Sequence, residues 1–323
     1  MMIALSNETE MESEGRRPQY HRPVLLKEVL GYLRPGLGKI FLDATIGGGG
    51  HSRALLEAGA EVIGVDQDPD AISESMAALA NFRSRLTLIR SNFVDITRSL
   101  KEMSLSGFDG VLVDLGISSH QLDTPQRGFS FQHSGPLDMR MGPNVPRKAS
   151  DLVNFAPEEE LVRIFRDYGE EPAARRVAAE IVRTRVSHPY STTAELAQAV
   201  EAVLPRRGPR HPATRIFQAL RIAVNDELRT IERALPLLAE QVKPGGRFAI
   251  ITFQSLEDRL VKQFFRQVTQ EWVDRPEWPE PRRNPSFGFK PITSRPVEPS
   301  EQELADNPRS RSAKLRVIER NLL

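Results

Sequence analysis

The chain has 323 residues, 39% of them hydrophobic, which is enough for a sizeable core and for a second domain or a large insertion. Its 44 basic and 43 acidic residues leave a net charge of +1, so a nucleic acid would have to be held by local basic clusters. The absence of cysteine excludes disulfides and zinc–thiolate sites. No apolar run approaches the roughly 20 residues of a membrane helix.

Residues 1–17 are polar and acidic, without the hydrophobic centre of a signal peptide, and we expect a disordered leader there. These features together predict a cytoplasmic protein with no membrane partner and no metal site. The sequence does not determine the oligomeric state, and a homodimer is left open.

After the leader, short apolar runs alternate with helix-forming stretches. The runs expected to be buried strands are 39–43, 61–66, 86–89 and 110–114. Continuous apolar strands separated by helices are typical of a parallel sheet that helices cover on both faces. The sequence therefore predicts an α/β fold.

Beyond the fourth strand the alternation stops. Residues 116–148 show no periodicity, and only helical patterns follow, including a capping box at Thr192–Glu195. One long helix is expected to carry apolar residues from Leu220 to Leu238, before Lys243–Gly246 end it and a fifth strand begins at 247–253. The economical interpretation is a helical domain inserted between the fourth and fifth strands of one sheet.

The expected domains are a ligand-binding core in two parts, 1–123 and 216–323, and an inserted helical domain, 124–215. The fifth strand is expected to pair with the strand at Gly110. The Pro- and charge-rich tail, 274–307, is expected to be an irregular loop before a last strand over 314–319.

A run of four glycines lies in the segment Asp43–His51, between the first strand and the first helix. Ligands bind at the carboxyl ends of strands in open parallel sheets, and glycines let the backbone approach a ligand closely. A flexible turn is the alternative. Asp66 ends the second strand, at a place where an acid can accept both hydroxyls of a ribose; a helix cap is the alternative there.

Two nucleotide cofactors, NAD and S-adenosylmethionine, bind such loops. The dinucleotide fingerprint fails in both possible registers, because Ser52 or Arg53 stands where the third position requires glycine or alanine. Asp43 would repel a pyrophosphate and attract a sulfonium cation. The sequence therefore favours S-adenosylmethionine.

The fourth strand leads into a polar segment, Asp114–Asp123. In the usual methyltransferase strand order this edge lies beside the first strand, so the segment would face the reactive end of the cofactor. Asp114 and Gln121 are the polar groups placed to contact adenine, the amino-acid part or the target. A loop side chain in water is the alternative for Gln121.

With these motifs the chain resembles the bacterial 16S ribosomal RNA (cytosine-N4)-methyltransferase family. The resemblance covers nearly the whole chain, and its motifs are highly specific together. They are His21–Leu26, Asp43–Ser52, Val65–Pro69, Asp114–Asp123, Arg127–Phe131, Gly135–Met141, His211–Arg215, Phe217–Ala219 and Ser255–Arg259. One departure is Gly48, where the family often has a larger residue.

The resemblance implies a Rossmann-like class I methyltransferase fold with a helical domain inserted after the fourth strand. It implies S-adenosylmethionine-dependent methylation of the N4 amine of one cytosine in the decoding region of 16S ribosomal RNA, within the small ribosomal subunit. The cofactor contacts carried over by position are Gly49, Gly50, His51, Asp66, Phe93, Asp114 and Gln121. Phe93 would stack on adenine, or it is an ordinary core residue.

The sequence leaves the catalytic residue undetermined. The cytosine amine is a poor nucleophile, so a group must accept a hydrogen bond from it. Many amino-methyltransferases use Asn or Asp before Pro-Pro-aromatic, whereas this chain has Asp114 followed by Leu and Gly. We take Asp114 as the first candidate and Asp138 as the second. His51 is expected to line the helix start, with a general base as the alternative. Glu257–Arg259 is expected to be a solvated, charged helix start, with a role near the site as the alternative.

Basic clusters are candidates for phosphate contacts, with a solvated loop as the alternative for each. They are 205–211, Arg282–Arg283, and Arg309, Arg311, Lys314 and Arg316. Three rival functions remain: methylation of DNA or another RNA, a non-catalytic assembly factor that binds the small subunit, and, least favoured, an NAD enzyme.

Overall fold

The computed structural model describes residues 23–96, 100, 106–206, 208 and 211–322. The expected leader, 1–17, and two arginines of the basic segment, Arg207 and Arg210, lie outside these residues. Among the helices that are described, none is long and apolar enough to cross a membrane.

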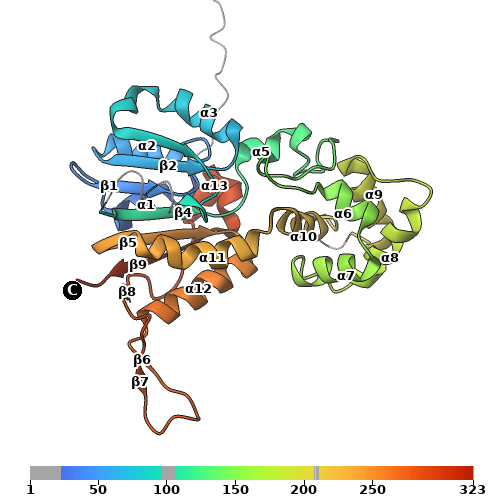
Figure 1. The fold of residues 1–323 in the computed structure, drawn as a ribbon. Coiled ribbons are helices and arrows are strands. Elements are labelled where there is room, and N and C mark those ends of the chain that lie inside the picture. Colours follow the sequence, from blue (N-terminus) through green and yellow to red (C-terminus); the bar gives the residue numbers. More distant parts are fainter. Residues whose placement is uncertain (1–22, 97–99, 101–105, 207, 209–210, 323) are drawn as a thin grey trace, which may run out of the picture.

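A seven-stranded sheet forms the centre of the molecule (Figure 1). Its order is β3-β2-β1-β4-β5-β9-β8, with the first five strands parallel and the last two antiparallel. The strands are β1 Ile40–Asp43, β2 Glu61–Asp66, β3 Leu86–Arg90, β4 Phe108–Asp114, β5 Val242–Thr252, β8 Phe289–Pro291 and β9 Lys314–Arg320. The order reverses between β1 and β4, which places the ligand-binding switch point of an open α/β sheet at their carboxyl ends.

Helices cover both faces of the sheet, because successive strand residues point to opposite sides. One face carries α1 Leu26–Leu33, α2 Gly50–Glu57 and α3 Pro69–Ala78, and the other carries α11 Glu227–Glu240 and α12 Ser255–Thr269. On β1, Phe41 packs in the hydrophobic cluster on the α1–α3 face, and its neighbour Leu42 packs in the cluster on the α11–α12 face. Both side chains are fully buried. The predicted parallel sheet with helices on both faces is confirmed.

The fifth strand returns to the same sheet after the insertion. β5 pairs with β4 in parallel, with Gly110 opposite Arg247, as predicted. β5 begins earlier than expected, at Val242, and the ladder is irregular between Phe108 and Gly110. β9 confirms the last predicted strand.

Between β4 and β5 the chain builds a separate group of helices beside the carboxyl ends of the strands (Figure 1). They are α5 Ser119–Asp123, η2 Pro125–Arg127, α6 Ala149–Phe155, α7 Glu158–Asp167, α8 Ala174–Arg185, α9 Thr193–Val203 and α10 Thr214–Asn225. The helices from α6 to α10 share a hydrophobic cluster of their own, which runs from Phe129 to Val224. The predicted capping box of α9 is present. The domain boundaries at 123 and 215 stay predictions.

The single long helix predicted through Leu220 and Leu238 is wrong. α10 ends at Asn225, Asp226 takes a left-handed conformation with φ 49° and ψ 40°, and α11 begins at the next residue. Leu220 packs in the inserted cluster, whereas Leu238 packs on the sheet. The helix is interrupted at Asp226 because α10 packs in the core of the insertion, whereas α11 packs on the sheet.

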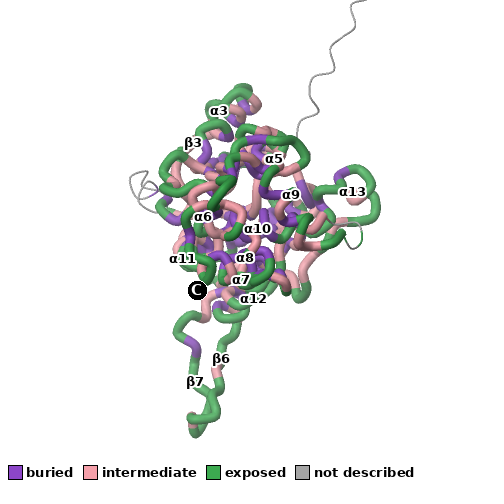
Figure 2. Tube along the Cα trace, turned by 90° about the vertical axis from the view of Figure 1, so that its right-hand side faces the viewer, coloured by how far each residue is buried: buried purple, intermediate pink, exposed green. Residues whose placement is uncertain are grey.

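The tail is more ordered than the irregular loop predicted over 274–307. It contains β7 Arg282–Arg283, β8 and α13 Glu301–Asp306, and it is flanked by β6 Trp272–Val273 and η3 Pro308–Ser312. β6 and β7 form a hairpin that projects from the body and is mostly exposed (Figure 2). A further short helix, η1 Ala80–Arg85, joins α3 to β3.

Candidate active site

Three carboxylates gather where the parallel strands end. Asp43, Asp66 and Asp114 are the last residues of β1, β2 and β4. β1 lies between β2 and β4 in the sheet, so the three side chains belong to one edge, which faces the inserted helices (Figure 1). This is the edge at which an open α/β sheet binds its ligand.

The glycine loop joins β1 to α2 with two residues in the left-handed region. Gly47 has φ 50° and Gly49 has φ 79°, and Gly49 caps α2. A Cβ on Gly49 would lie 2.9 Å from the Leu79 side chain, whereas a Cβ on Gly47 would meet open space. The loop therefore needs glycine for its conformation and leaves room above Gly47 for a ligand.

The side chain of Asp43 is hydrogen-bonded to residues on both sides of the glycine loop. Its Oδ2 accepts a hydrogen bond of 2.6 Å from the Ser52 hydroxyl, and its Oδ1 accepts one of 3.3 Å from the Thr45 amide. Burial raises the pKa of Asp43 to about 6, against the opposing effect of these bonds. Asp43 was noted in the sequence only for its charge, and its contacts give it a structural part in the loop.

Asp66 joins the glycine loop to the loop after β2. Its Oδ2 accepts a hydrogen bond of 3.1 Å from the Gly47 amide, and its Oδ1 accepts one of 2.9 Å from the Asp68 amide. Burial raises the pKa of Asp66 to about 6. Asp66 therefore does not cap α3; that cap is Asp68, whose Oδ1 accepts from the Asp70 amide.

Gln121, on α5, points back to this loop. Its Nε2 donates a hydrogen bond of 2.7 Å to Oδ2 of Asp68, and its Oε1 accepts one of 3.2 Å from the Ser118 amide. Gln121 is buried, so it is not a loop side chain in water. Asp68 is the link that sequence reasoning missed, because a carboxylate before Pro69 has the ordinary explanation of a helix cap.

Asp114 and His51 lie side by side, with 3.7 Å between Oδ2 and Nδ1. His51 Nε2 lies 2.9 Å from the Val24 carbonyl, which can only accept, so the ring proton sits on Nε2. Burial lowers the pKa of His51 to about 4, so the ring is neutral and does not compensate Asp114. Burial, followed by the charges of Asp43 and Glu257, holds the pKa of Asp114 well above its usual range.

Glu257 belongs to the same group of carboxyls, which corrects the prediction of a solvated helix start. It is buried, and its Oε2 accepts hydrogen bonds from the Phe253 and Gln254 amides at 2.9 and 3.2 Å. Burial raises its pKa to about 7, although Arg221 opposes the shift from 3.7 Å. Arg221 in turn makes two hydrogen bonds of 2.8 Å to Glu227.

The other members of the predicted helix start lie away from this group. Asp258 is bound to Arg316, with hydrogen bonds of 2.7 and 3.0 Å, and Arg259 is exposed beside Glu170.

Phe93 follows β3 and reaches a small cavity beside this group. The cavity has a volume of about 50 Å³. Its lining residues are Thr45, Phe93, Leu115, Gly116, Asn225, Glu227, Thr230, Ile231 and Glu257. Phe93 is half-buried and packs against the core on the α11 face, and its stacking on adenine stays a prediction.

These residues fit a cationic nucleoside cofactor. Asp114 Oδ1 is buried and has no hydrogen-bond partner in the part of the chain that is described. A buried carboxyl left without a partner is costly, and a bound cation would relieve that cost. The carboxyls at the strand ends suit a sulfonium and an ammonium group, and Asp66 suits ribose hydroxyls. As cofactor contacts, the seven residues carried over by position stay predictions.

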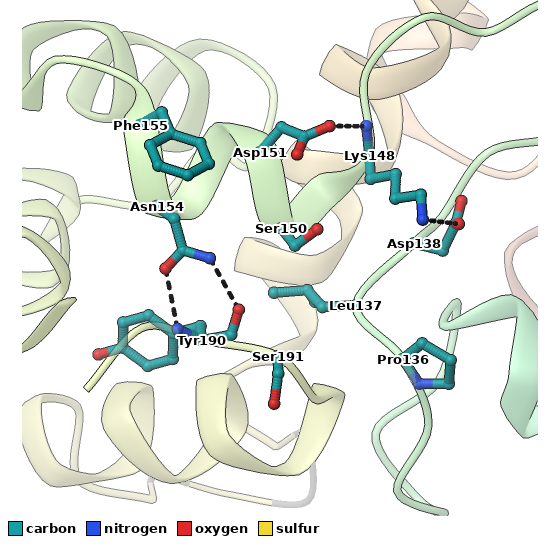
Figure 3. A pocket seen from close by; sticks show the side chains of 10 residues that line it. All are labelled: Pro136, Leu137, Asp138, Lys148, Ser150, Asp151, Asn154, Phe155, Tyr190 and Ser191. Carbon is teal, nitrogen blue, oxygen red and sulfur yellow. Dashed lines mark hydrogen bonds and ion pairs between the residues drawn. The ribbon is translucent and has the colours of Figure 1, made fainter.

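Asp138, the second candidate for the proton acceptor, stands in a different environment. Its carboxylate receives hydrogen bonds of 2.7 and 2.9 Å from Arg140 and lies 3.7 Å from Lys148. Burial opposes its ionisation, but the bonds from Arg140 lower its pKa. It lines a cavity of about 300 Å³ in the insertion, opposite the exposed Phe155 (Figure 3). Both Asp138 oxygens are engaged by cations, whereas Asp114 Oδ1 has no partner among the described residues, so Asp114 stays the first candidate.

The arginines of the basic clusters differ in their exposure and in their ion pairs. Arg206, Arg282 and Arg283 are exposed. Arg309 pairs with Asp123, and Arg316 is committed to Asp258. Within the described ranges, no group of three or more His, Cys, Asp or Glu side chains is arranged to hold a metal ion.

Comparison with known proteins gives a consistent family. The model of the MraW methylase family matches residues 18–321. A protein of Carboxydothermus hydrogenoformans named ribosomal RNA small subunit methyltransferase H is 47% identical over 303 residues, covering 93% of this chain and 97% of that protein. A protein of the same name from Anaeromyxobacter sp. (strain Fw109-5) is 49% identical over 303 residues, with coverages of 93% and 97%.

Solved structures resemble the chain more distantly. An rRNA methylase from Streptococcus thermophilus has a TM-score of 0.41 and 11% identity, and the match covers 92% of this chain and 93% of that one. An S-adenosylmethionine-dependent O-methyltransferase from Thermotoga maritima has a TM-score of 0.39 and 10% identity, with coverages of 96% and 69%. Because these TM-scores are low, the family assignment rests on the family model and the sequence relatives.

Proposed function

The chain belongs to the MraW methylase family, and on that premise we propose that it methylates the exocyclic N4 amine of a cytosine in the decoding region of 16S ribosomal RNA. S-adenosylmethionine is the methyl donor. The observation that carries the proposal is the buried, unpartnered Oδ1 of Asp114 at the carboxyl end of β4, between the glycine loop and the inserted helices. This is an acceptor placed at the reactive edge of the sheet.

The chain's own residues supply the binding. The glycine loop, which is open above Gly47, would place the backbone of Gly49 and Gly50 against the amino-acid part. Asp66 would accept the ribose hydroxyls, and Gln121 and Phe93 would contact the adenine. His51 lines the wall beside Asp114, where it is neutral. When bound, the cofactor supplies a methyl group on a positively charged sulfur.

The transfer depends mainly on positioning. The sulfur loses its positive charge during the transfer, so carboxylates beside it would stabilise the ground state more than the transition state. The rate would therefore come from holding the amine in line with the methyl carbon. We assign Asp114 Oδ1 to accept a hydrogen bond from the amine and to take its proton once the nitrogen carries the methyl group. Its raised pKa makes it a better proton acceptor than an ordinary aspartate.

The insertion would form one wall of the RNA cleft. It leaves the sheet at the end of β4 and returns at α11, beside the edge where the methyl group would lie. The target base must be presented unstacked. Arg206 is exposed near the end of this segment and suits a phosphate contact. A substrate within the small ribosomal subunit implies a cytoplasmic location, and the homodimer stays open.

The test is incubation of the protein and labelled cofactor with undermethylated small subunits, free 16S ribosomal RNA and DNA. Digestion and mass spectrometry then identify the labelled nucleoside. We expect N4-methylcytidine from one position of the subunit RNA. Label in DNA, or in a different base, would overturn the proposed substrate, and no label in any nucleic acid would favour a non-catalytic assembly factor.

A further inference from the structure

The first segment of the insertion, residues 125–142, lies directly on the loop that follows β2; we call this segment the clasp. Arg127 makes the contact. Its Nη2 lies 2.7 Å from Asp68 Oδ2, and its Nη1 lies 3.0 Å from Asp70 Oδ2. At Gly142, a Cβ would come within 3.2 Å of the Gln67 carbonyl, so the backbones themselves are close.

Asp68 connects Arg127 to two residues assigned to the cofactor. Its amide donates to Asp66 at 2.9 Å, and its Oδ2 accepts a hydrogen bond of 2.7 Å from Gln121 and forms an ion pair with Arg127. Asp68 is only 1% exposed, so its charge cannot be solvated and depends on these donors. The guanidinium of Arg127 is the one cation within ion-pair distance of this carboxylate among the described residues.

The clasp is held in one conformation. Gly128 has φ 73°, and a Cβ there would come within 2.2 Å of the Pro136 carbonyl. Met139 donates its amide to the Arg127 carbonyl at 3.0 Å. Arg127 Nη2 also donates to the Arg140 carbonyl at 3.1 Å, which ties the guanidinium to the backbone near the end of the clasp.

The far side of the clasp is bound to the end of α10. Asn225 accepts a hydrogen bond of 2.8 Å from the Met141 amide and donates one of 2.8 Å to the Met139 carbonyl. Asn225 directly precedes Asp226, where the chain returns from the insertion to the sheet. A series of hydrogen bonds, with the ion pair between Arg127 and Asp68 as one link, therefore runs from Asp66 to the point of return.

We propose that Arg127 is a positioning residue for the cofactor: by holding Asp68, it fixes Gln121 and the Asp66 loop in the arrangement that binds the nucleoside. The inference rests on the proposed cofactor contacts. It makes cofactor affinity depend on the inserted segment, and by linkage it requires cofactor binding to stabilise the clasp in return. Arg127 itself need not touch the cofactor.

The first test is calorimetry of S-adenosylmethionine binding to wild type, Arg127→Gln and Arg127→Lys. Loss of a charge-assisted contact should weaken binding about tenfold in Arg127→Gln, and should raise the KM for cofactor with little change in kcat at saturation. Arg127→Lys keeps one ion pair and should be intermediate. The matched control is Arg183→Gln, which removes an exposed pair with Glu180 on α8 and should bind as wild type does.

Two outcomes would overturn the positioning role, and they are distinguishable. If Arg127→Gln binds the cofactor normally while Asp66→Ala does not, the site is right and Arg127 has no part in it. If both variants bind normally, the proposed cofactor contacts themselves are wrong.

The second test needs no variant, so a folding defect cannot obscure it. Hydrogen exchange of the wild-type amides is measured with and without S-adenosylmethionine. The amides of Gly128 and Met139 should exchange several-fold more slowly with cofactor, while those of α7 and α8 should not change. Unchanged exchange in the clasp would contradict the proposal.

Discussion

Affinity for S-adenosylmethionine should fall as the solution is acidified, because burial has raised the pKa values of the carboxyls at the strand ends. The pKa of Asp66 is about 6 in the protein without cofactor. Ribose hydroxyls donate to the ionised form, so binding lowers this pKa and favours the carboxylate. The contribution of Asp66 is therefore full above pH 7 and is lost as the pH falls through 6.

The magnitude follows from the ionised fraction. A group of pKa 6 is half ionised at pH 6 and about one tenth ionised at pH 5, so Asp66 alone weakens binding about tenfold at pH 5. Asp43 has a pKa of about 6 as well. Its carboxylate is held by Ser52 and Thr45 within the loop and is not one of the proposed cofactor contacts, so the expected loss stays at about tenfold.

Calorimetry from pH 5 to pH 8 measures this dependence, and buffers of different ionisation enthalpy count the protons released. Asp66→Asn is the control: it should bind more weakly at pH 7.5 and show a shallower slope with pH. An affinity that stays constant in the wild type across this range would refute the reasoning, because the ionised carboxylate would then not be what the cofactor selects.

Three further results are expected. Gly49→Ala, which puts a Cβ at φ 79° against Leu79, should cost about 1 kcal/mol in urea unfolding and weaken cofactor binding; a fully stable, normally binding variant would contradict the loop assignment. Arg221→Met leaves Glu227 and Glu257 without their cation and should cost about 3–5 kcal/mol of stability, which unchanged urea unfolding would disprove. Arg206→Ala should reduce the salt slope of subunit binding by about 1; an identical slope would make this a solvated loop.

The strands and the glycine loop could be predicted because their signals are local. A buried parallel strand needs a continuous apolar run, and a loop with positive φ at Gly47 and Gly49 needs glycine. The position of Asp66 and Asp114 at strand ends then follows from the runs themselves. The inserted helices could be expected because their periodicity replaces the strand pattern between β4 and β5.

What the sequence missed depends on contacts between distant segments. The apolar spacing continues from α10 into α11, and only the tertiary packing shows that the two helices belong to different cores; Asp at 226 tolerates the left-handed conformation that separates them. Glu257 has the charged neighbours of an exposed helix start, yet Arg221 and the end of β5 surround it. Asp68 carries the ordinary signal of a helix cap, and its bonds to Gln121 and Arg127 have no local pattern.

We propose that methyl transfer takes place at the carboxyl end of β4, with Asp114 as the acceptor. The direct measurement is the single-turnover rate of N4-methylcytidine formation on small subunits, with saturating cofactor, for the wild type and Asp114→Asn. The substitution keeps the shape of the side chain and removes its ability to take a proton, so the rate should fall by about 10²–10⁴-fold in a variant that still binds the subunit. A wild-type rate from Asp114→Asn would contradict the account and move the chemistry to another group.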